Sequence, residues 1–184
     1  MKNTENSYGL VTIIIHWIVA LAVFGLFGLG WWMVELDYYS PWYQQGPDIH
    51  KSVGIVLFVL MAFRVIWKYV QVTPKKLATH TKLEQEIGSI VHVLLYVMLF
   101  VLMISGYLIS TADGRAIAVF ELFNVPGLGE LFANQEDVAG IVHEYLAYTL
   151  MAVVFLHMVA AFKHHFIDKD DTLNRMTGHA KNSH

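Results

Sequence analysis

The stretch that decides the fold is residues 139–166, AGIVHEYLAYTLMAVVFLHMVAAFKHHF. It is apolar for long enough to cross a hydrocarbon core of about 30 Å, which takes about 20 helical residues. It also carries two histidines, His143 and His157, which are 14 residues apart. This spacing is nearly four turns at about 3.6 residues per turn, so both imidazoles project from one helical face, about 21 Å apart along the axis. We therefore predict a membrane-spanning helix that carries two stacked ligating groups.

Three other stretches are apolar over a comparable length. Hydrophobic residues make up 56% of the 184-residue chain and charged residues only 15%, whereas globular proteins average about 45–50% and about 25%. The period-two alternation of a membrane β-barrel is missing. We therefore predict an all-α, integral membrane four-helix bundle, a single domain over residues 1–184, whose spans are Leu10–Val34, His50–Val70, Gly88–Ile109 and Ala139–Phe166.

Composition also excludes several classes of function. The net charge of −3 offers no basic field for nucleic acid. The absence of cysteine excludes disulfides, iron–sulfur clusters, c-type haem attachment and thiolate zinc sites. Ten histidines remain, which is an excess for so apolar a chain.

The positive charges predict the orientation. Cytoplasmic loops of membrane proteins carry the excess of Lys and Arg. The N-terminus, the second loop and the C-terminal tail, with their flanks, hold ten of the twelve basic residues, and the other two loops hold Lys51 and Arg115. We therefore expect both termini in the cytoplasm. The ten are Lys2, Arg64, Lys68, Lys75, Lys76, Lys82, Lys163, Lys169, Arg175 and Lys181.

Two of the loops carry local predictions. Residues 35–49 contain Pro41, Gly46 and Pro47, which are typical of a turn-rich connection. Residues 110–138 hold an apolar patch, Ala116–Phe123, that we expect to form a short helix lying in the membrane interface.

Four histidines match in pairs by depth. With the predicted orientation, His16 and His157 each lie about two to three turns from the cytoplasmic ends of their helices, while His50 and His143 lie within about one turn of the outer ends. Ligating groups at membrane depth are costly and mark function. One helix that supplies two histidines, each met by a histidine from another helix, predicts two bis-histidine haem b sites, because imidazole suits iron.

A second pattern supports haem binding. A small residue follows each of these histidines four positions later on the same helical face, where a porphyrin needs room: Ala20, Gly54, Ala147 and Ala161. The competing interpretation is that single histidines bond between helices and that small residues serve helix packing.

The chain resembles the bacterial cytochrome b561 family of di-haem, four-helix membrane cytochromes over nearly its whole length. The resemblance rests on His16-Trp17, on His50-Lys51-Ser52-Val53-Gly54, on His143-Glu144, and on His157 followed by His164-His165 and a Lys169-Asp170-Asp171-Thr172-Leu173 tail. It implies a bacterial inner membrane location, His16 with His157 on an inner haem, and His50 with His143 on an outer haem. One type in this family oxidises superoxide and reduces ubiquinone, and this activity is the one we expect. Other relatives are quinone-linked cytochrome subunits of dehydrogenases, which is the alternative.

The remaining charged and histidine residues suggest substrate sites. His92 and His164 lie at the cytoplasmic side and are candidates for ubiquinone binding, because imidazole donates hydrogen bonds and titrates near neutrality. Their other interpretation is anchoring of helix ends. Lys51 and Arg115 are candidates for guiding superoxide, an anion, or for pairing with haem propionates. Arg64 pairs with a propionate or extends its charge to the headgroups. We expect membrane lipid around the helices and no obligate protein partner.

Overall fold

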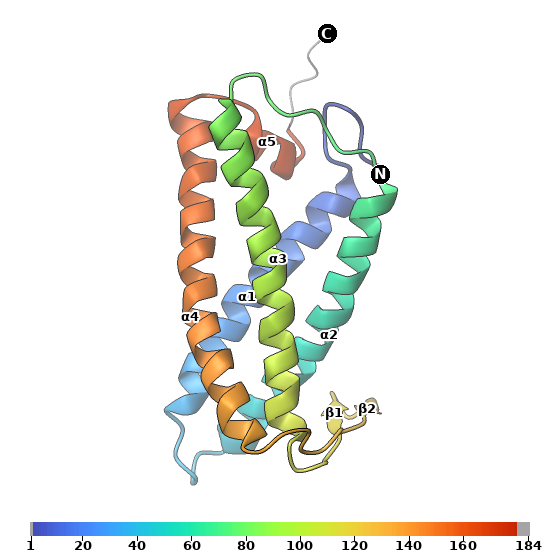
Figure 1. Cartoon of the computed structure of the whole chain (residues 1–184), viewed down its shortest axis with the longest axis vertical. Coiled ribbons are helices and arrows are strands. Elements are labelled where there is room, and N and C mark those ends of the chain that lie inside the picture. Colours follow the sequence, from blue (N-terminus) through green and yellow to red (C-terminus); the bar gives the residue numbers. More distant parts are fainter. Residues whose placement is uncertain (1, 180–184) are drawn as a thin grey trace. The chain divides into compact units, whose positions relative to one another are not determined.

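The computed structural model describes residues 2–179 and is mostly helical. Its four long helices are α1 (Leu10–Val34), α2 (Trp42–Val70), α3 (Lys82–Thr111) and α4 (Gln135–Phe162), drawn in Figure 1. A π-helical turn, η1 (Lys163–Ile167), continues α4, and a short helix, α5 (Thr172–Thr177), follows it. Two short antiparallel strands, β1 (Ile117–Val119) and β2 (Phe123–Val125), lie between α3 and α4.

All four long helices are long and apolar enough to cross a membrane. Their outward faces carry large apolar side chains that stay exposed: Leu21, Val59, Ile90 and Phe155 are 63–71% accessible. A soluble protein rarely exposes contiguous apolar surface on this scale. Hydrocarbon is therefore the medium that these faces require.

Contacts divide the chain into two compact units, and each unit contains one segment of every long helix. The termini unit consists of residues 1–18, 62–97 and 149–184, and the hairpin unit of residues 19–61 and 98–148. Of the four paired histidines, His16 and His157 belong to the termini unit, whereas His50 and His143 belong to the hairpin unit. Both members of each predicted pair thus belong to the same unit.

Polar contacts hold the termini unit together at its loop end. Thr81 and Glu84 form a capping box at the start of α3: the Thr81 hydroxyl accepts from the Glu84 amide, and the Glu84 carboxylate accepts from the Thr81 amide. Lys163, the first residue of η1, pairs with Glu84 at 2.8 Å. The Trp17 indole donates to the Met176 carbonyl at 2.7 Å, which docks α5 on α1.

The strand pair in the hairpin unit corrects one prediction. Residues 116–123 do not form an interfacial helix, because Ile117 pairs with Val125 and Val119 with Phe123 in an antiparallel hairpin. The buried Ser52 side chain fixes the turn: its hydroxyl donates to the Ala118 carbonyl and accepts from the Phe120 amide at 3.0 Å. The amphipathic pattern of this segment therefore comes from a strand that buries Ile117 and Val119 on one face.

The predicted spans lie inside the observed helices or nearly so. α1 coincides with its prediction, and α4 begins four residues earlier and passes into η1. α2 begins eight residues before the predicted start and includes Pro47, which the sequence placed in a loop. Pro47 is the sixth residue of α2, so the helix forgoes the bond that a residue 47 amide would donate to the Tyr43 carbonyl. Lys181, one of the basic residues used for the orientation, lies outside the described residues.

Candidate haem and quinone sites

His143 sits in the setting of a metal-bound histidine. Its Nδ1 atom lies 2.9 Å from the Leu102 carbonyl and 3.2 Å from the Ser105 hydroxyl. A carbonyl only accepts, so Nδ1 carries the proton and Nε2 keeps its lone pair. A backbone partner on the other ring nitrogen is what fixes the tautomer and orientation of most metal-bound histidines.

His50 is enclosed but lacks such a partner. Its Nδ1 atom is buried with no hydrogen-bond partner among residues 2–179. A buried polar group left in this state costs about 1–3 kcal/mol. Because Nδ1 of His50 makes no hydrogen bond, the imidazole does not serve to join helices through that atom. This favours a role for His50 as a metal ligand.

Two glycines allow these imidazoles to lie against the neighbouring helices. A Cβ atom on Gly30 would lie 3.3 Å from Cε1 of His50, and one on Gly106 would lie 3.0 Å from Cε1 of His143. Both separations are tighter than ordinary van der Waals contact, so a larger residue at either position would push the imidazole out of place.

The spacing of the hairpin-unit pair fits one shared iron. The ring centroids of His50 and His143 are 6.1 Å apart. Metal–imidazole bonds of about 2 Å on opposite sides of one ion place the two centroids about 6 Å apart. A Cβ on Gly54, the small residue four positions after His50, would meet no atom within 4 Å, so there is room beside the ligand helix. The residues present therefore fit a bis-histidine haem.

His16 has a different first contact. A terminal nitrogen of Arg64 lies 3.1 Å from His16 Nδ1. Arginine only donates, so this contact requires an unprotonated Nδ1 and leaves the proton of a neutral ring on Nε2. Coordination of iron through Nε2 requires the opposite tautomer. Haem ligation by His16 therefore requires Arg64 to leave this nitrogen, which frees its guanidinium for a carboxylate such as a propionate.

His157 has His92 as its ring neighbour. The centroids of His92 and His157 are 5.2 Å apart at an interplanar angle of 65°. Arg64 also lies over the Tyr96 ring, 5.4 Å from its centroid. The termini unit thus shows two contacts, one between His16 and Arg64 and one between His92 and His157. His157 has a third imidazole beside it that the predicted pairing with His16 does not use.

The two ubiquinone candidates occupy different surroundings. His92 faces His157, as described. His164 Nδ1 lies 2.7 Å from the Asp168 carboxylate, and its ring lies beside that of His80 with centroids 4.1 Å apart and an interplanar angle of 31°. His92 therefore adjoins the proposed haem ligands, whereas His164 belongs to a polar cluster at the end of α4.

Lys51 and Arg115, the candidates for guiding superoxide, are each paired with a neighbouring acid. Lys51 Nζ lies 2.7 Å from Asp48, and Arg115 pairs with Asp113. Hydrogen bonds from the Arg115 backbone and side chain hold the pKa of Asp113 below its usual value, so this acid stays ionised at neutral pH. The Arg115 side chain is 85% exposed, and the Lys51 side chain is 34% exposed.

Sequence reasoning missed several residues of these sites. Gly30, Gly106 and Ser105 lie on helices that face the ligands, so no spacing within the ligand helix reveals them. His80, in the loop before α3, contacts the buried Asp170 carboxylate at 2.7 Å. The two residues are 90 positions apart, so no local spacing indicates this contact.

Apolar spanning helices and histidines paired within them define a membrane b-type cytochrome. Consistent with this, the sequence model of the family described as prokaryotic cytochrome b561 matches residues 7–179, and the chain belongs to that family. The protein is therefore a four-helix membrane electron-transfer cytochrome that binds two b-type haems and has quinones as electron partners.

Curated relatives cover almost the whole chain. Cytochrome b561 homolog 2 of Escherichia coli (strain K12) is 44% identical over 96% of this chain and 94% of its own length. A Yersinia pestis protein named Probable superoxide oxidase CybB is 30% identical over 94% of this chain and 96% of its own length. Cytochrome b561 homolog 1 of Escherichia coli (strain K12) is 29% identical over 93% of this chain and 97% of its own length.

Proposed function

We propose that this protein oxidises superoxide to oxygen and passes the electrons through its two haems to ubiquinone. The observation that carries the proposal is that each unit holds its own histidine cluster, so one chain has both a receiving and a delivering redox site. The name of the Yersinia pestis relative supplies superoxide as the electron donor to test. Two superoxide ions, one quinone and two protons give two oxygen molecules and one quinol.

The proposed axial ligands are His50 with His143 in the hairpin unit and His16 with His157 in the termini unit. When bound, haem supplies one-electron oxidation and reduction at iron, and the protein sets its potential and position. Leu102 and Ser105 hold the His143 ring with a free Nε2. Arg64 contacts His16 Nδ1 and would have to leave it for His16 to hold haem through Nε2.

Superoxide approaches the hairpin unit in this proposal. Lys51 and Arg115 are the proposed guiding residues, since an anion is drawn toward a locally positive surface. Asp48 and Asp113 partly neutralise both cations. The attraction is therefore short-ranged and should weaken steeply with salt.

Ubiquinone is proposed to bind in the termini unit with His92 and His164 as hydrogen-bond donors. Reduction consumes two protons, and imidazoles are suited to deliver them near neutral pH. The excess of Lys and Arg in the termini unit supports a cytoplasmic location for this unit in the bacterial inner membrane. Protons would then be taken from the cytoplasm.

The alternative is that the chain is the cytochrome subunit of a membrane dehydrogenase. The observation that favours it is exposed apolar surface around the strand pair, where Leu122 is 82% exposed, Leu128 62% and Leu131 60%. Exposed apolar patches of this kind mark interaction surfaces. A docked dehydrogenase would then deliver the electrons in place of superoxide.

Stopped-flow absorbance of the purified protein separates the two functions. Under the proposal, a superoxide pulse reduces the haems with no other subunit present, and a soluble ubiquinone analogue reoxidises them. Lys51→Glu should slow reduction, while Lys76→Glu, a charge change in the termini unit, should not. His164→Ala should leave reduction intact and slow reoxidation, with His179→Ala as the matched control. Haems that stay oxidised under superoxide but are reduced by a dehydrogenase establish the alternative.

A further inference from the structure

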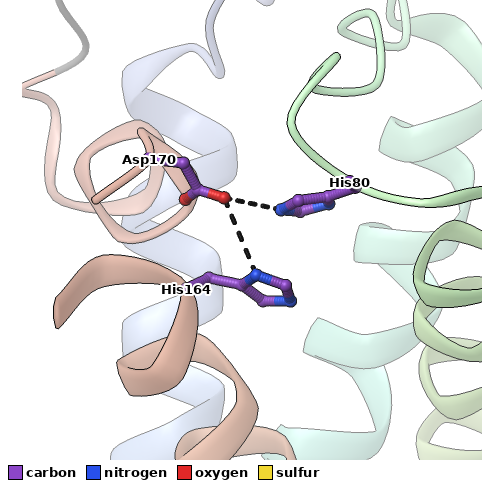
Figure 2. Close-up of side chains that lie close together, drawn as sticks. All are labelled: His80, His164 and Asp170. Carbon is purple, nitrogen blue, oxygen red and sulfur yellow. Dashed lines mark hydrogen bonds and ion pairs between the residues drawn. The ribbon is translucent and has the colours of Figure 1, made fainter. Parts of the chain in front are cut away.

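A polar cluster outside the haem ligands joins three chain segments of the termini unit. Figure 2 shows His80 from the loop before α3, His164 from η1 and Asp170 from the segment before α5, with both imidazoles directed at one carboxylate. The Asp170 Oδ2 atom lies 2.7 Å from His80 Nε2 and 3.7 Å from His164 Nδ1. The Asp170 side chain is only 2% exposed, and the two histidine side chains are 17% and 13% exposed.

We propose that His80, His164 and Asp170 bind a divalent transition-metal ion of the zinc type. One nitrogen of each imidazole and one carboxylate oxygen all lie within 4.8 Å of one another. Two imidazoles and a carboxylate are a donor set that zinc takes in proteins, with a fourth position left open. This site is separate from the haem irons and does not depend on the identity of the electron donor.

The distances suit such an ion after a small adjustment. Zinc bonds of about 2.0–2.1 Å in a tetrahedral arrangement separate neighbouring ligand atoms by about 3.3 Å. The observed 2.7 Å and 3.7 Å lie on either side of that value, so the first separation must widen by about 0.6 Å and the second must shorten by about 0.4 Å to complete the site. The orientation of the Asp170 carboxylate is already fixed, because its second oxygen accepts a hydrogen bond from the Thr172 amide at 2.8 Å.

Charge also favours a cation at this position. The His80 and His164 rings have centroids 4.1 Å apart at an interplanar angle of 31°, so protonating both would place two like charges together. A metal ion lets both imidazoles stay neutral, and the Asp170 carboxylate offsets part of its charge. To bind the ion through Nδ1, His164 must give up the 2.7 Å hydrogen bond between that atom and Asp168. Lys163 pairs with Asp168 and Glu84, so its charge is already offset.

Metal binding would clamp the loop before α3, the end of α4 and the segment before α5. The haem-loaded protein should be dialysed against zinc chloride, with bound zinc measured by elemental analysis against haem iron as the internal standard. We expect one zinc per two irons in the wild type. His80→Ala and Asp170→Asn should weaken binding by at least about 10–100-fold, and His179→Ala, a histidine outside the cluster, should bind as the wild type does.

Hydrogen exchange provides a second measurement that does not depend on activity. Zinc should slow exchange of the backbone amides in residues 71–81 and 168–177 of the wild type and have no such effect in His80→Gln. Unchanged haem content in each variant shows that the protein is folded. A wild type that takes up no stoichiometric zinc, or a His80→Ala variant that binds zinc as tightly as the wild type, would overturn the proposal and leave the cluster a hydrogen-bond network. His164 is also a proposed quinone donor, but zinc content and hydrogen exchange are measured without quinone, so the two proposals fail or succeed in separate experiments.

Discussion

Replacing Gly106 by alanine should loosen one haem and spare the other. The new Cβ would lie 3.0 Å from Cε1 and 3.2 Å from Nδ1 of His143, whereas ordinary carbon contacts are at about 3.5–4.0 Å. The ring must therefore retreat by about 0.5–1 Å, which strains the 2.9 Å bond from Nδ1 to the Leu102 carbonyl. Overpacking of this kind costs about 1–3 kcal/mol, which corresponds to about 5- to 150-fold weaker haem binding.

The assay is transfer of haem from the purified protein to excess apomyoglobin, followed by absorbance. Gly106→Ala should release one haem faster by the same factor and keep the second at the wild-type rate. Gly25→Ala is the matched control, because a Cβ there meets nothing within 4 Å and alanine favours the helix. Wild-type release of both haems from Gly106→Ala would refute the assignment of His143 as a ligand packed on Gly106.

Three further predictions test other parts of the structure. His16→Ala should remove one haem and His50→Ala the other, as measured by haem-to-protein ratio and reduced-minus-oxidised spectra; loss of the same haem in both variants contradicts the pairing. Gly54→Leu should exclude the haem beside His50, whereas Ala22→Leu, away from the histidine face, should keep full haem content. Burial raises the pKa of Asp170, but hydrogen bonds from Thr172 and His80 outweigh it and leave the pKa below its usual 3.8. The ionised Asp170 carboxylate therefore stabilises the folded protein above about pH 4, and this stabilisation is lost as the pH falls through the lower folded-state pKa. The rates at which pepsin cleaves residues 168–177 should differ between the wild type and Asp170→Asn at pH 5 and converge at the lowest pH.

Much of the architecture could be predicted because lipid imposes a simple rule on each segment by itself. A long apolar stretch must be a helix, so the prediction for Leu10–Val34 needed no knowledge of neighbours. The errors lie where tertiary contacts decide the structure. Pro47 is typical of a loop, but it lies inside α2. The segment 116–123 forms part of a strand pair, to which Ser52 of α2 supplies two hydrogen bonds.

In the candidate site, too, features of a single helix could be predicted, and features that depend on contacts between helices could not. The histidine spacing in α4 is a property of one helix, and the structure keeps His143 and His157 in that single continuous helix. The residues that hold the imidazoles come from other helices, so Gly106, Leu102 and Arg64 had no local pattern to reveal their roles. The contact between His80 and Asp170 joins residues 90 positions apart and depends on the path of the loop.

The confinement of each histidine cluster to its own unit bears on how such a protein can evolve. A substitution near His50 and His143 changes packing within residues 19–61 and 98–148 and leaves the partners of His157 as they were. Selection can thus change the reduction potential of one haem without changing that of the other. Under the proposed function, a new electron donor can be adopted in the hairpin unit while the quinone chemistry of the termini unit is inherited intact.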